Sequence, residues 1–572
     1  MTIQKCRDRP IHANRTMRVI CVGAGVSGLY LAYKLRKHFT DYILDIYEKN
    51  ADIGGTWFEN RYPGCACDIP AHNYTYTFEP NPNWSASYAS AAEIFEYLSG
   101  FAEKYDLRQF ITCHHEVVGA LWKEDQAAWS VKVRKPNGAI FEQQCDFLIN
   151  GAGILNAWRW PDIAGLDSFQ GTLVHTAQWD AAIDVEGKKV GIIGNGSSGV
   201  QILPEIQRRA QHVTAFSRGP TWITPSPAME HHVYTDEEKQ LFRDNPSKLL
   251  NMRKSSEAIM ASASLFSTFL KGSNAQDVFR SQMEIHMKGK IHDDNLAKKL
   301  VPDFPFGCRR PTPGTDYLES LTKPNVTICH EAIEEITPSG CVTADGQEHL
   351  VHILVCATGF DNTFCPRFPI IGRDGANLAE EWEKEPRNYL SVAVNGFPNY
   401  FMFTGPNCPF GSGGIIVGIE AEGTYMTNFF NRWQKEDIKF FDPKKEAVDE
   451  FMEQKDLFMD TTVWAKGCRS WWKHKKTGKV TALWPGSTLH YLEALAHPRY
   501  DDFEVQYACS NRFSYLGNGF SQRQLDPTAD LVYYLRESDE GSVFADGMST
   551  RNAKDLGGSA IWGIAKGRKI NP

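Results

Sequence analysis

Two glycine-rich motifs in this chain have the spacing needed to bind the pyrophosphate of a dinucleotide. The first covers residues 23–28 (GAGVSG) and the second covers residues 194–199 (GNGSSG). Glycines permit a tight turn and a close backbone approach to the pyrophosphate, which then lies at the N-terminus of the following helix, where free N–H groups favour an anion. Two such motifs predict two dinucleotides. The residues assigned to them are Gly23, Gly25, Gly28, Asn195, Gly196, Ser197, Ser198 and Gly199.

The residue that ends the next strand differs between the two motifs. Glu48 follows Gly28 by twenty residues, whereas Arg218 follows Gly199 by nineteen. A carboxylate at this position accepts hydrogen bonds from a ribose diol, and an arginine suits a 2′-phosphate. The first motif is therefore predicted to bind FAD and the second NADPH.

The elements around these motifs have the order that such sites require. Residues 18–22 (RVICV) and 190–193 (VGII) are short apolar runs, typical of buried parallel strands, and each leads into the glycines and then into a helical pattern. Residues 91–105 have the apolar spacing of an amphipathic helix, while residues 127–134 alternate as a strand does. A capping box starting at Thr235 predicts a helix start, and the i, i+4 pair Leu296 and Leu300 predicts a further helix.

The composition indicates a multidomain globular protein. The chain has 572 residues, of which 42% are hydrophobic, and a net charge of -8 with a pI of about 6.1. A protein with this net negative charge has no overall positive electrostatic field that would attract nucleic acid or an anionic membrane. No apolar run reaches the length of a membrane span, and the N-terminus is polar, so a soluble, cytoplasmic protein is predicted. No oligomeric state is predicted.

The fourteen cysteines are not spaced as in a disulfide-rich scaffold, which in a chain of this size predicts reduced, mostly buried thiols. Cys65 and Cys67 are the only close pair, and they lack the C-x-x-C spacing of redox and zinc sites. Neither a metal site nor a dithiol centre is therefore predicted.

Residues 169–180 (FQGTLVHTAQWD) fit the pattern F-x-G-x-x-x-H-x-x-x-W-[P/D] through five fixed positions: Phe169, Gly171, His175, Trp179 and Asp180. This pattern is the fingerprint of the Baeyer–Villiger monooxygenases, and the chain resembles that family over roughly residues 18–500. The resemblance implies an NADPH- and oxygen-dependent flavin monooxygenase that converts ketones to esters or lactones through a flavin peroxide. It also places the fingerprint at a hinge between domains.

Further segments carry the same resemblance. Residues 54–68 (GGTWFENRYPGCACD) are similar to the segment that covers the flavin in the family, and residues 306–310 (FGCRR) are similar to the one that carries its catalytic arginine. That arginine maps to Arg310, with Asp68 as its partner. Arg309 stands where many relatives have lysine. The remaining residues that the resemblance assigns to cofactor binding are Thr56, Trp57, Tyr74, Val117, Gln201 and Trp471.

These observations predict an α/β fold with two Rossmann-like dinucleotide-binding domains and a helical insertion. The predicted segments are residues 1–155 (FAD domain, first part), 156–224 (NADPH domain, first part), 225–302 (helical insertion), 303–390 (NADPH domain, second part) and 391–572 (FAD domain, second part, and C-terminal region).

Three other functions share some of these features. A related flavin monooxygenase that oxygenates amine or sulfur atoms has both nucleotide sites and differs mainly around the positions of Trp179 and Asp180. A disulfide reductase would need a cysteine pair beside the flavin. An NADPH-binding sensor would not oxidise NADPH with oxygen uptake.

Overall fold

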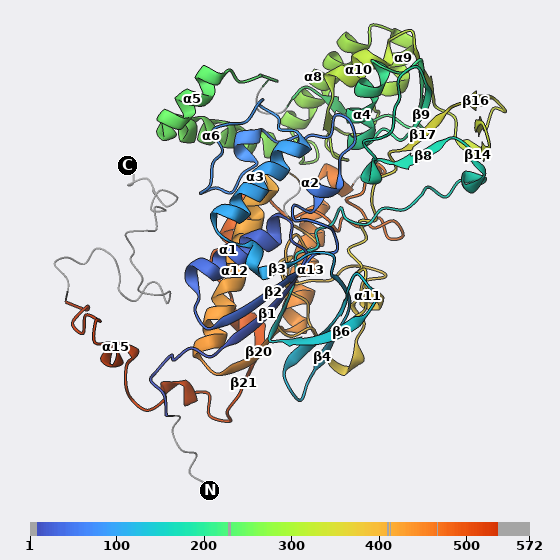
Figure 1. Ribbon diagram of the computed structural model, residues 1–572. Helices are drawn as coiled ribbons and strands as arrows, with labels where there is room; N and C mark the ends of the chain where they lie inside the picture. Colours follow the sequence, from blue (N-terminus) through green and yellow to red (C-terminus); the bar gives the residue numbers. More distant parts are fainter. Residues whose placement is uncertain (1–7, 227–229, 409–410, 412, 466, 536–572) are drawn as a thin grey trace.

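The computed structural model describes residues 8–226, 230–408, 411, 413–465 and 467–535. A five-stranded parallel sheet, with the strand order β19-β7-β1-β2-β3, forms the first nucleotide-binding unit (Figure 1). The apolar run predicted as a strand is β1, and its carboxyl end leads into Gly23 and then α1. The bounds are β1 (Met17–Val22), β2 (Tyr42–Tyr47), β3 (Ile111–Thr112), β7 (Phe147–Asn150), β19 (Tyr400–Met402) and α1 (Val26–His38).

A second five-stranded parallel sheet has the order β13-β10-β9-β17-β8. Strand β9 lies at its centre, as β1 does in the first sheet, and leads into Gly194 and helix α4. The fold class predicted from the sequence, α/β with two Rossmann-like units, is confirmed. The bounds are β8 (Thr172–His175), β9 (Lys189–Ile193), β10 (His212–Phe216), β13 (Val326–Cys329), β17 (Ile353–Cys356) and α4 (Ser197–Gln207).

Helices follow the predicted signals closely. The Thr235 hydroxyl and the Glu238 carboxylate form the reciprocal bonds of a capping box at the start of α5, and Ser90 and Glu93 do the same for α3. Each pair satisfies two N–H groups that the first turn leaves unpaired. The helices are α2 (Thr56–Glu59), α3 (Ala91–Lys104), α5 (Asp236–Asp244), α6 (Pro246–Met260), α7 (Ala263–Ser267), α8 (Asn274–Ile291), α9 (Asp294–Leu300), α10 (Thr315–Leu321), α11 (Leu378–Glu381), α12 (Ile415–Lys435), α13 (Lys445–Met459), α14 (Thr488–Leu495) and α15 (Gln522–Leu525).

The long helix α12 packs against α1 in the first unit (Figure 1), although the two are far apart in the chain. Its apolar face joins the buried side chains of α1, and Gly423 allows the Tyr30 ring to approach, since a Cβ there would lie 2.6 Å from that ring. The other strands are β4 (Glu116–Lys123), β5 (Ala128–Arg134), β6 (Ile140–Cys145), β11 (Ile223–Thr224), β12 (Thr312–Pro313), β14 (Ile333–Thr337), β15 (Gly340–Thr343), β16 (Glu348–Leu350), β18 (Ile370–Ile371), β20 (Ile438–Pro443) and β21 (Phe503–Tyr507).

The prediction that all cysteines are reduced is wrong for two of them. Cys308 and Cys468, which are 160 positions apart in the sequence, form a disulfide with their Cα atoms 6.3 Å apart. Sequence spacing could not indicate this bond, because it depends on two loops that meet only in the folded chain. Eight other described cysteines are buried thiols, as predicted.

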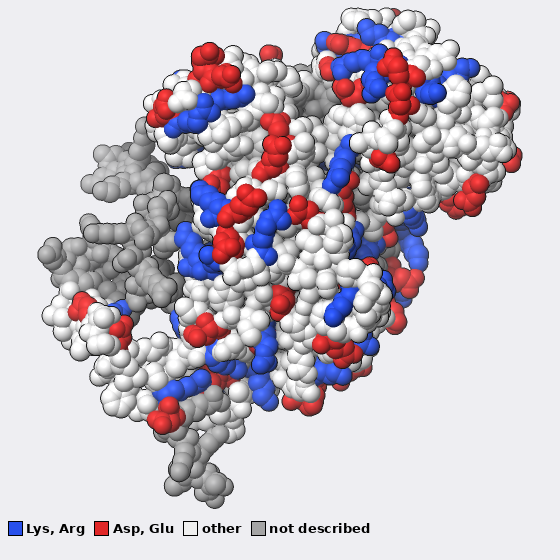
Figure 2. Space-filling view, viewed as in Figure 1, with Lys and Arg blue, Asp and Glu red and all other residues white. Residues whose placement is uncertain are grey.

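The surface in Figure 2 has acidic and basic side chains interspersed over the face shown. Within the described ranges, no helix combines the length and the apolar character that crossing a bilayer requires. The tail after Gly541 is rich in Gly, Ser, Lys and Arg, which predicts a partly extended segment; these residues lie outside those the structure describes.

Candidate active site

Both glycine motifs open into one cavity of about 1850 Å³. All but two of the residues assigned from the sequence line it. The exceptions are Gly28 and Gly199, which lie where each helix meets its strand: a Cβ at Gly28 would be 2.2 Å from the Gly23 carbonyl oxygen, and one at Gly199 would be 2.1 Å from that of Gly194. These two glycines are therefore required for packing. The lining residues are Gly23, Gly25, Glu48, Thr56, Trp57, Asp68, Tyr74, Val117, Asn195, Gly196, Ser197, Ser198, Gln201, Arg218, Arg309, Arg310 and Trp471.

The N-termini of α1 and α4 suit an anionic group. Gly25 and Gly196 are their N-cap residues, and neither helix has a side-chain cap or an acidic residue in its first turn. The N–H groups at these ends have no side chain to accept their hydrogen bonds, and the helix dipole favours negative charge there. Both residues line the cavity, so each helix end offers a pyrophosphate site.

Glu48 is buried at the end of β2 and is already held by the backbone. Its Oε2 accepts a hydrogen bond from the Ala24 N–H at 2.9 Å, and its Oε1 accepts one from the Asn50 N–H at 2.9 Å. Burial raises the pKa of this carboxyl above its ordinary value. Each oxygen keeps a further lone pair, so the carboxylate can still accept from a ribose hydroxyl in the cavity.

Arg310 and Asp68 form an ion pair between segments that are 242 positions apart. The arginine donates from Nη2 at 2.6 Å and from Nε at 3.1 Å, and both bonds end on Asp68 Oδ2. The neighbouring carboxylate raises the pKa of the guanidinium. Within the part of the chain that the structure describes, no bond from Arg310 Nη1 is recorded, so this nitrogen can donate to a ligand. Asp68 thus holds the permanently charged guanidinium of Arg310 in one orientation in the cavity.

Gln201 connects the two nucleotide-binding units. It projects from α4, donates from Nε2 to the Ala66 carbonyl at 2.9 Å, and accepts from the Tyr62 hydroxyl at 2.8 Å. The segment it holds leads directly to Asp68. Elsewhere in the cavity lining, the Trp57 ring meets Tyr74 edge-on and donates to its hydroxyl at 3.2 Å. Gln201 of the second unit thus fixes residues 62–66 of the first.

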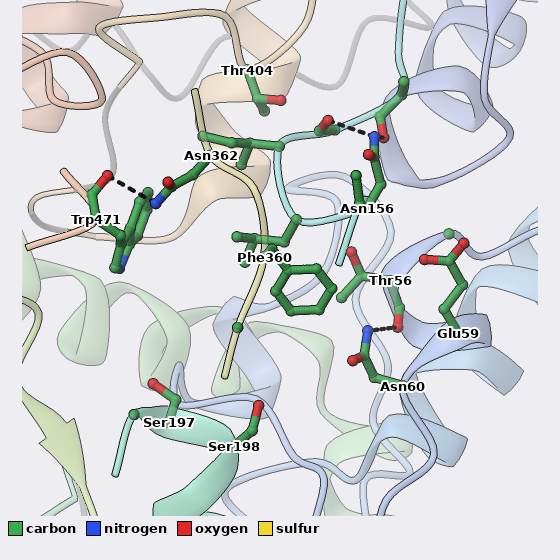
Figure 3. Close-up of a pocket in the computed structure, with 18 of the residues that line it drawn as sticks. Thr56, Glu59, Asn60, Asn156, Ser197, Ser198, Phe360, Asn362, Thr404 and Trp471 are labelled. Atoms are coloured by element: carbon green, nitrogen blue, oxygen red, sulfur yellow. Dashed lines mark hydrogen bonds between the residues drawn. The ribbon is translucent and has the colours of Figure 1, made fainter. Parts of the chain in front are cut away.

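Trp471 and Trp472 have different surroundings. Trp472 is buried in an apolar cluster with Trp464 and Val480, whereas Trp471 lines the cavity. The Trp471 carbonyl accepts a hydrogen bond from Asn362 Nδ2 at 2.9 Å (Figure 3). The two residues lie in a turn, and their rings meet edge-on with centroids 6.0 Å apart. Only the first tryptophan of the pair can therefore contact a cofactor.

Arg218 and Arg309 lie on the wall formed by the second unit. Arg309 donates from Nη1 to the Pro220 carbonyl at 3.3 Å, and burial lowers the pKa of its guanidinium. Arg218 follows the carboxyl end of β10 and is exposed to the cavity. Among the described residues, no carboxylate forms an ion pair with Arg218. Its charge is therefore open to an external anion.

The fingerprint residues lie outside the cavity lining and pack the segments beside it. His175 is fully buried at the end of β8 and stacks on Trp158 with ring centroids 4.6 Å apart, while Phe360 meets it edge-on. Burial lowers its pKa to about 4, so the ring is neutral. Its Nδ1 accepts from the Ala177 N–H. Trp158 and Phe360 lie on the two segments that join the sheets, so His175 packs where these two segments meet. Its role at a hinge between the domains stays a prediction.

Sequence reasoning missed several polar residues of the cavity. Lys473, His474 and Lys475 line it next to Trp471, and Asn362, which binds the Trp471 carbonyl, and Thr404 line it as well (Figure 3). The basic run has the composition of a solvated loop, and only the fold brings it to the site. Thr404 had a usable signal, since it lies in a Gly-Pro-containing turn directly after an apolar strand.

Glu422 on α12 accepts a hydrogen bond from the backbone of Thr404 and so holds this part of the cavity wall. Its side chain is fully buried; Oε2 accepts from the Thr404 N–H at 3.0 Å, and Oε1 accepts from the Tyr491 hydroxyl at 2.8 Å and the Cys408 thiol at 3.4 Å. Burial raises the pKa of this carboxyl to about 7. Glu422 therefore takes up or releases a proton near neutral pH while it holds a turn of the cavity wall.

We expect Glu422→Gln to flatten the dependence of stability on pH. The folded chain binds this proton more tightly than the unfolded chain, so the contribution to the free energy of unfolding is full below about pH 4.5 and is lost as the pH rises through about 7. The pKa difference corresponds to about 3 kcal/mol. Melting temperatures measured from pH 5 to 8 check this.

The control for this prediction is Glu453→Gln, since Glu453 is exposed on α13. Burial also raises the pKa of Asp442 to about 7, and Asp442 is present in wild type and in both variants. Part of the pH dependence of stability therefore remains in all three proteins. If the melting temperatures of wild type and Glu422→Gln changed with pH to the same extent, the assignment of this pH dependence to Glu422 would be wrong.

Comparison with known proteins agrees with this geometry. A family model described as an NAD(P)-binding Rossmann-like domain matches residues 21–91. FAD-binding monooxygenase tazF of Aspergillus terreus is 39% identical over 91% of this chain and 95% of that protein. A Baeyer–Villiger monooxygenase of Pseudomonas aeruginosa is 33% identical over 84% of this chain and 89% of that protein.

A solved structure of OTEMO in complex with FAD and NADP superimposes with a TM-score of 0.75, at 26% identity, over 87% of this chain and all of that chain. The shared sequence, the two nucleotide-binding units and the common cavity establish the cofactors as FAD and NADP. The chain belongs to the Baeyer–Villiger monooxygenase family and is an FAD-dependent monooxygenase that uses NADPH and O2.

Proposed function

We propose that this enzyme inserts oxygen next to the carbonyl of a ketone, giving an ester or a lactone. The observation that carries the proposal is the Arg310–Asp68 pair, in which the carboxylate orients a permanently charged guanidinium in the cavity into which both glycine motifs open. Oxygen insertion at a carbonyl develops negative charge on oxygen, and a preorganised cation stabilises such charge far better than water does.

We assign FAD to the first unit and NADP to the second. The buried carboxylate of Glu48 suits a ribose without a 2′-phosphate and would repel one with it, whereas Arg218 offers an open cation. The name of the family model for residues 21–91 mentions NAD(P), but FAD shares the same adenosine diphosphate half, so the name does not decide between them. When bound, the two cofactors supply the hydride transfer and the activation of oxygen.

The chain's own residues bind, orient and hold charge in this scheme. Asp68 fixes the Arg310 guanidinium through two bonds to one oxygen, so that Nη1 remains for the oxygen that becomes negative. Trp57 and Tyr74 line the same cavity as this pair, and a less polar wall strengthens the effect of the charge.

The purified enzyme should be tested with NADPH, O2 and a panel of linear, cyclic and polycyclic ketones, with product identification by gas chromatography and mass spectrometry. Esters or lactones are the expected products. An amine and a thioether belong in the same panel. Oxidation of these two without any ester would favour the related activity on nitrogen or sulfur and would refute the proposal.

We expect Arg218→Ala to raise the Michaelis constant for NADPH by on the order of tenfold to a hundredfold, because a charge-assisted bond to the 2′-phosphate is lost. The constant for NADH should change little. Steady-state kinetics with both cofactors measure this, and Arg209→Ala, which removes an arginine paired with Asp184 and Glu186 on the same unit, is the control. Equal effects on both cofactors would rule out the contact.

A further inference from the structure

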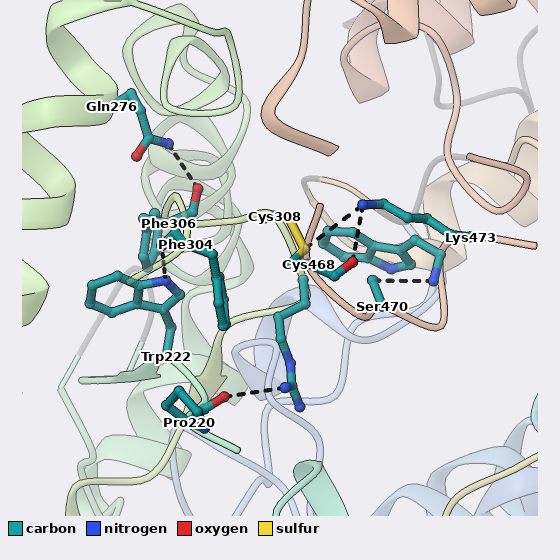
Figure 4. Close-up of a disulfide and its surroundings, with 11 residues drawn as sticks. Pro220, Trp222, Gln276, Phe304, Phe306, Cys308, Cys468, Ser470 and Lys473 are labelled. Carbon is teal, nitrogen blue, oxygen red and sulfur yellow. Dashed lines mark hydrogen bonds between the residues drawn. A yellow bond between two sulfur atoms is a disulfide. The ribbon is translucent and has the colours of Figure 1, made fainter. Parts of the chain in front are cut away.

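The disulfide between Cys308 and Cys468 joins two segments that carry candidate cofactor residues (Figure 4). Cys308 directly precedes Arg309 and Arg310, whereas Cys468 is followed by the loop that carries Trp471. It is the only cross-link recorded in the part of the chain that the structure describes. The bond therefore fixes the distance between the arginine segment and the tryptophan loop.

The far end of this loop has its own anchors. Trp472 is buried, its carbonyl accepts from the Thr481 N–H at 2.9 Å, and Lys479 pairs with Asp456 at 2.7 Å. These contacts tie residues 472–481 to α13 and to an apolar cluster. The disulfide lies at the near end, before Trp471. The loop is thus held at both ends, and one of the two attachments can be broken by electron transfer.

The two sulfur atoms differ in access and in charge. Cys308 is fully buried, while Cys468 is partly exposed and lines the cavity. The Lys473 ammonium lies 3.9 Å from the Cys468 sulfur and also donates to the Cys468 carbonyl at 3.1 Å. A nearby cation stabilises a thiolate. A small reductant can therefore reach Cys468 from the cavity, and the reduced form of this residue is favoured by its neighbour.

We propose that the Cys308–Cys468 disulfide is a redox-sensitive clamp that positions the Trp471 loop against the arginine segment and so retains NADP in the cavity. The inference rests on the proposed placement of NADP beside Arg309 and Trp471. Cys308 and Cys468 act here as positioning residues. In the reduced enzyme, the loop adopts the closed position for only part of the time, and the apparent affinity for NADP is multiplied by the fraction of time that the loop is closed.

The chemistry balances with a dithiol as the reductant. One thiolate of the dithiol attacks the Cys468 sulfur, the S–S bond breaks, and Cys308 leaves with the electron pair and takes up a proton. The second thiolate of the dithiol then displaces Cys468 and closes the reductant into a cyclic disulfide. Two electrons pass to the protein. Hydrogen peroxide reverses the change by oxidising the two thiols to the disulfide with release of two water molecules.

The test uses the full chain with FAD bound, either oxidised or treated with dithiothreitol. Alkylation followed by mass spectrometry establishes the state of both cysteines. Hydrogen–deuterium exchange of residues 467–478 and the dissociation constant of NADP⁺, measured by calorimetry, report on the clamp without turnover. The double variant Cys308→Ser/Cys468→Ser mimics the reduced state, and Cys365→Ser, which removes a cavity-lining thiol outside the disulfide, is the matched control.

We expect reduction to speed exchange in residues 467–478 and to raise the dissociation constant of NADP⁺ by about tenfold, which corresponds to a loop that is closed one tenth of the time. The double variant should show the same values and should not respond to dithiothreitol, while Cys365→Ser should behave as wild type. Exchange in α1 and the FAD content should stay unchanged.

The clamp is refuted if the oxidised and reduced proteins exchange and bind NADP⁺ alike, if the double variant still responds to reductant, or if both cysteines remain thiols after peroxide treatment. These outcomes are separate from the reaction on ketones. A protein that forms esters but ignores reduction overturns the clamp alone, whereas one that responds to reduction but forms no ester overturns the proposed function alone.

Discussion

Arg310→Ala should fold, retain FAD and form no measurable ester or lactone. The substitution removes the cation that Asp68 holds in the cavity at 2.6 Å, and losing one preorganised electrostatic contact typically lowers a rate on the order of a hundredfold to a thousandfold. NADPH oxidation that survives should release hydrogen peroxide in place of the ester. Gas chromatography of the products and a peroxide assay, run on the same sample, measure both.

Arg310→Lys sharpens this prediction. A lysine keeps the charge but has one nitrogen in place of the planar fork, so it cannot both bond to Asp68 from two nitrogens and present a third to the substrate. We expect it to be impaired as well. Arg367→Ala is the control, because Arg367 also lines the cavity but pairs with Asp361. Near-normal ester formation by Arg310→Ala would mean that the charge serves another purpose and that the reaction occurs elsewhere.

Local signals in the sequence were sufficient for the elements that carry the cofactor motifs. The run at residues 18–22 is mostly apolar because β1 is buried from Val19 to Val22, and two of the glycines that follow, Gly23 and Gly28, have a positive φ value or close contacts that a side chain would block. The capping box at Thr235 is equally local, since its two bonds involve residues three positions apart. Such features depend on neighbours in the chain, and a single sequence contains them.

Contacts between distant segments could not be predicted in the same way. The Cys308–Cys468 bond and the access of Lys473 to the cavity both depend on where a loop near residue 470 lies relative to the second unit. The fingerprint gives a different lesson. His175 is a strong sequence signal, yet it is buried against Trp158 outside the cavity lining, because a motif can mark a packing site as readily as a reacting one.

The glycines of each motif differ in whether the fold leaves space for a Cβ, and the motif alone does not show this difference. Gly28 and Gly199 have no space for a Cβ, so alanine at either position would disturb the packing of helix on strand whatever ligand is bound. Gly25 and Gly196 do have space. A Cβ at Gly25 would be 3.6 Å from Gly55, an ordinary contact, and one at Gly196 would meet nothing within 4 Å. Their φ values, −78° and −75°, are also open to alanine.

Gly25→Ala and Gly196→Ala are therefore a matched pair in which the methyl group obstructs only the cofactor. We expect Gly25→Ala to purify with little FAD, because the methyl group projects where the pyrophosphate must approach the backbone. Gly196→Ala should remain yellow and lose at least tenfold in NADPH affinity, about 1.4 kcal/mol. Flavin absorbance relative to protein and NADPH titration measure the two effects.

The melting temperatures of the two variants, measured without cofactors, should match that of the wild-type protein, which separates cofactor loss from misfolding. Gly28→Ala serves as the contrasting control, since it should lower the melting temperature through the clash with the Gly23 carbonyl. If Gly25→Ala kept its flavin while Gly196→Ala lost it, the order of the two sites would be the reverse of the one proposed. The Glu48 carboxylate and the Arg218 guanidinium would then not discriminate between the two cofactors at the ribose.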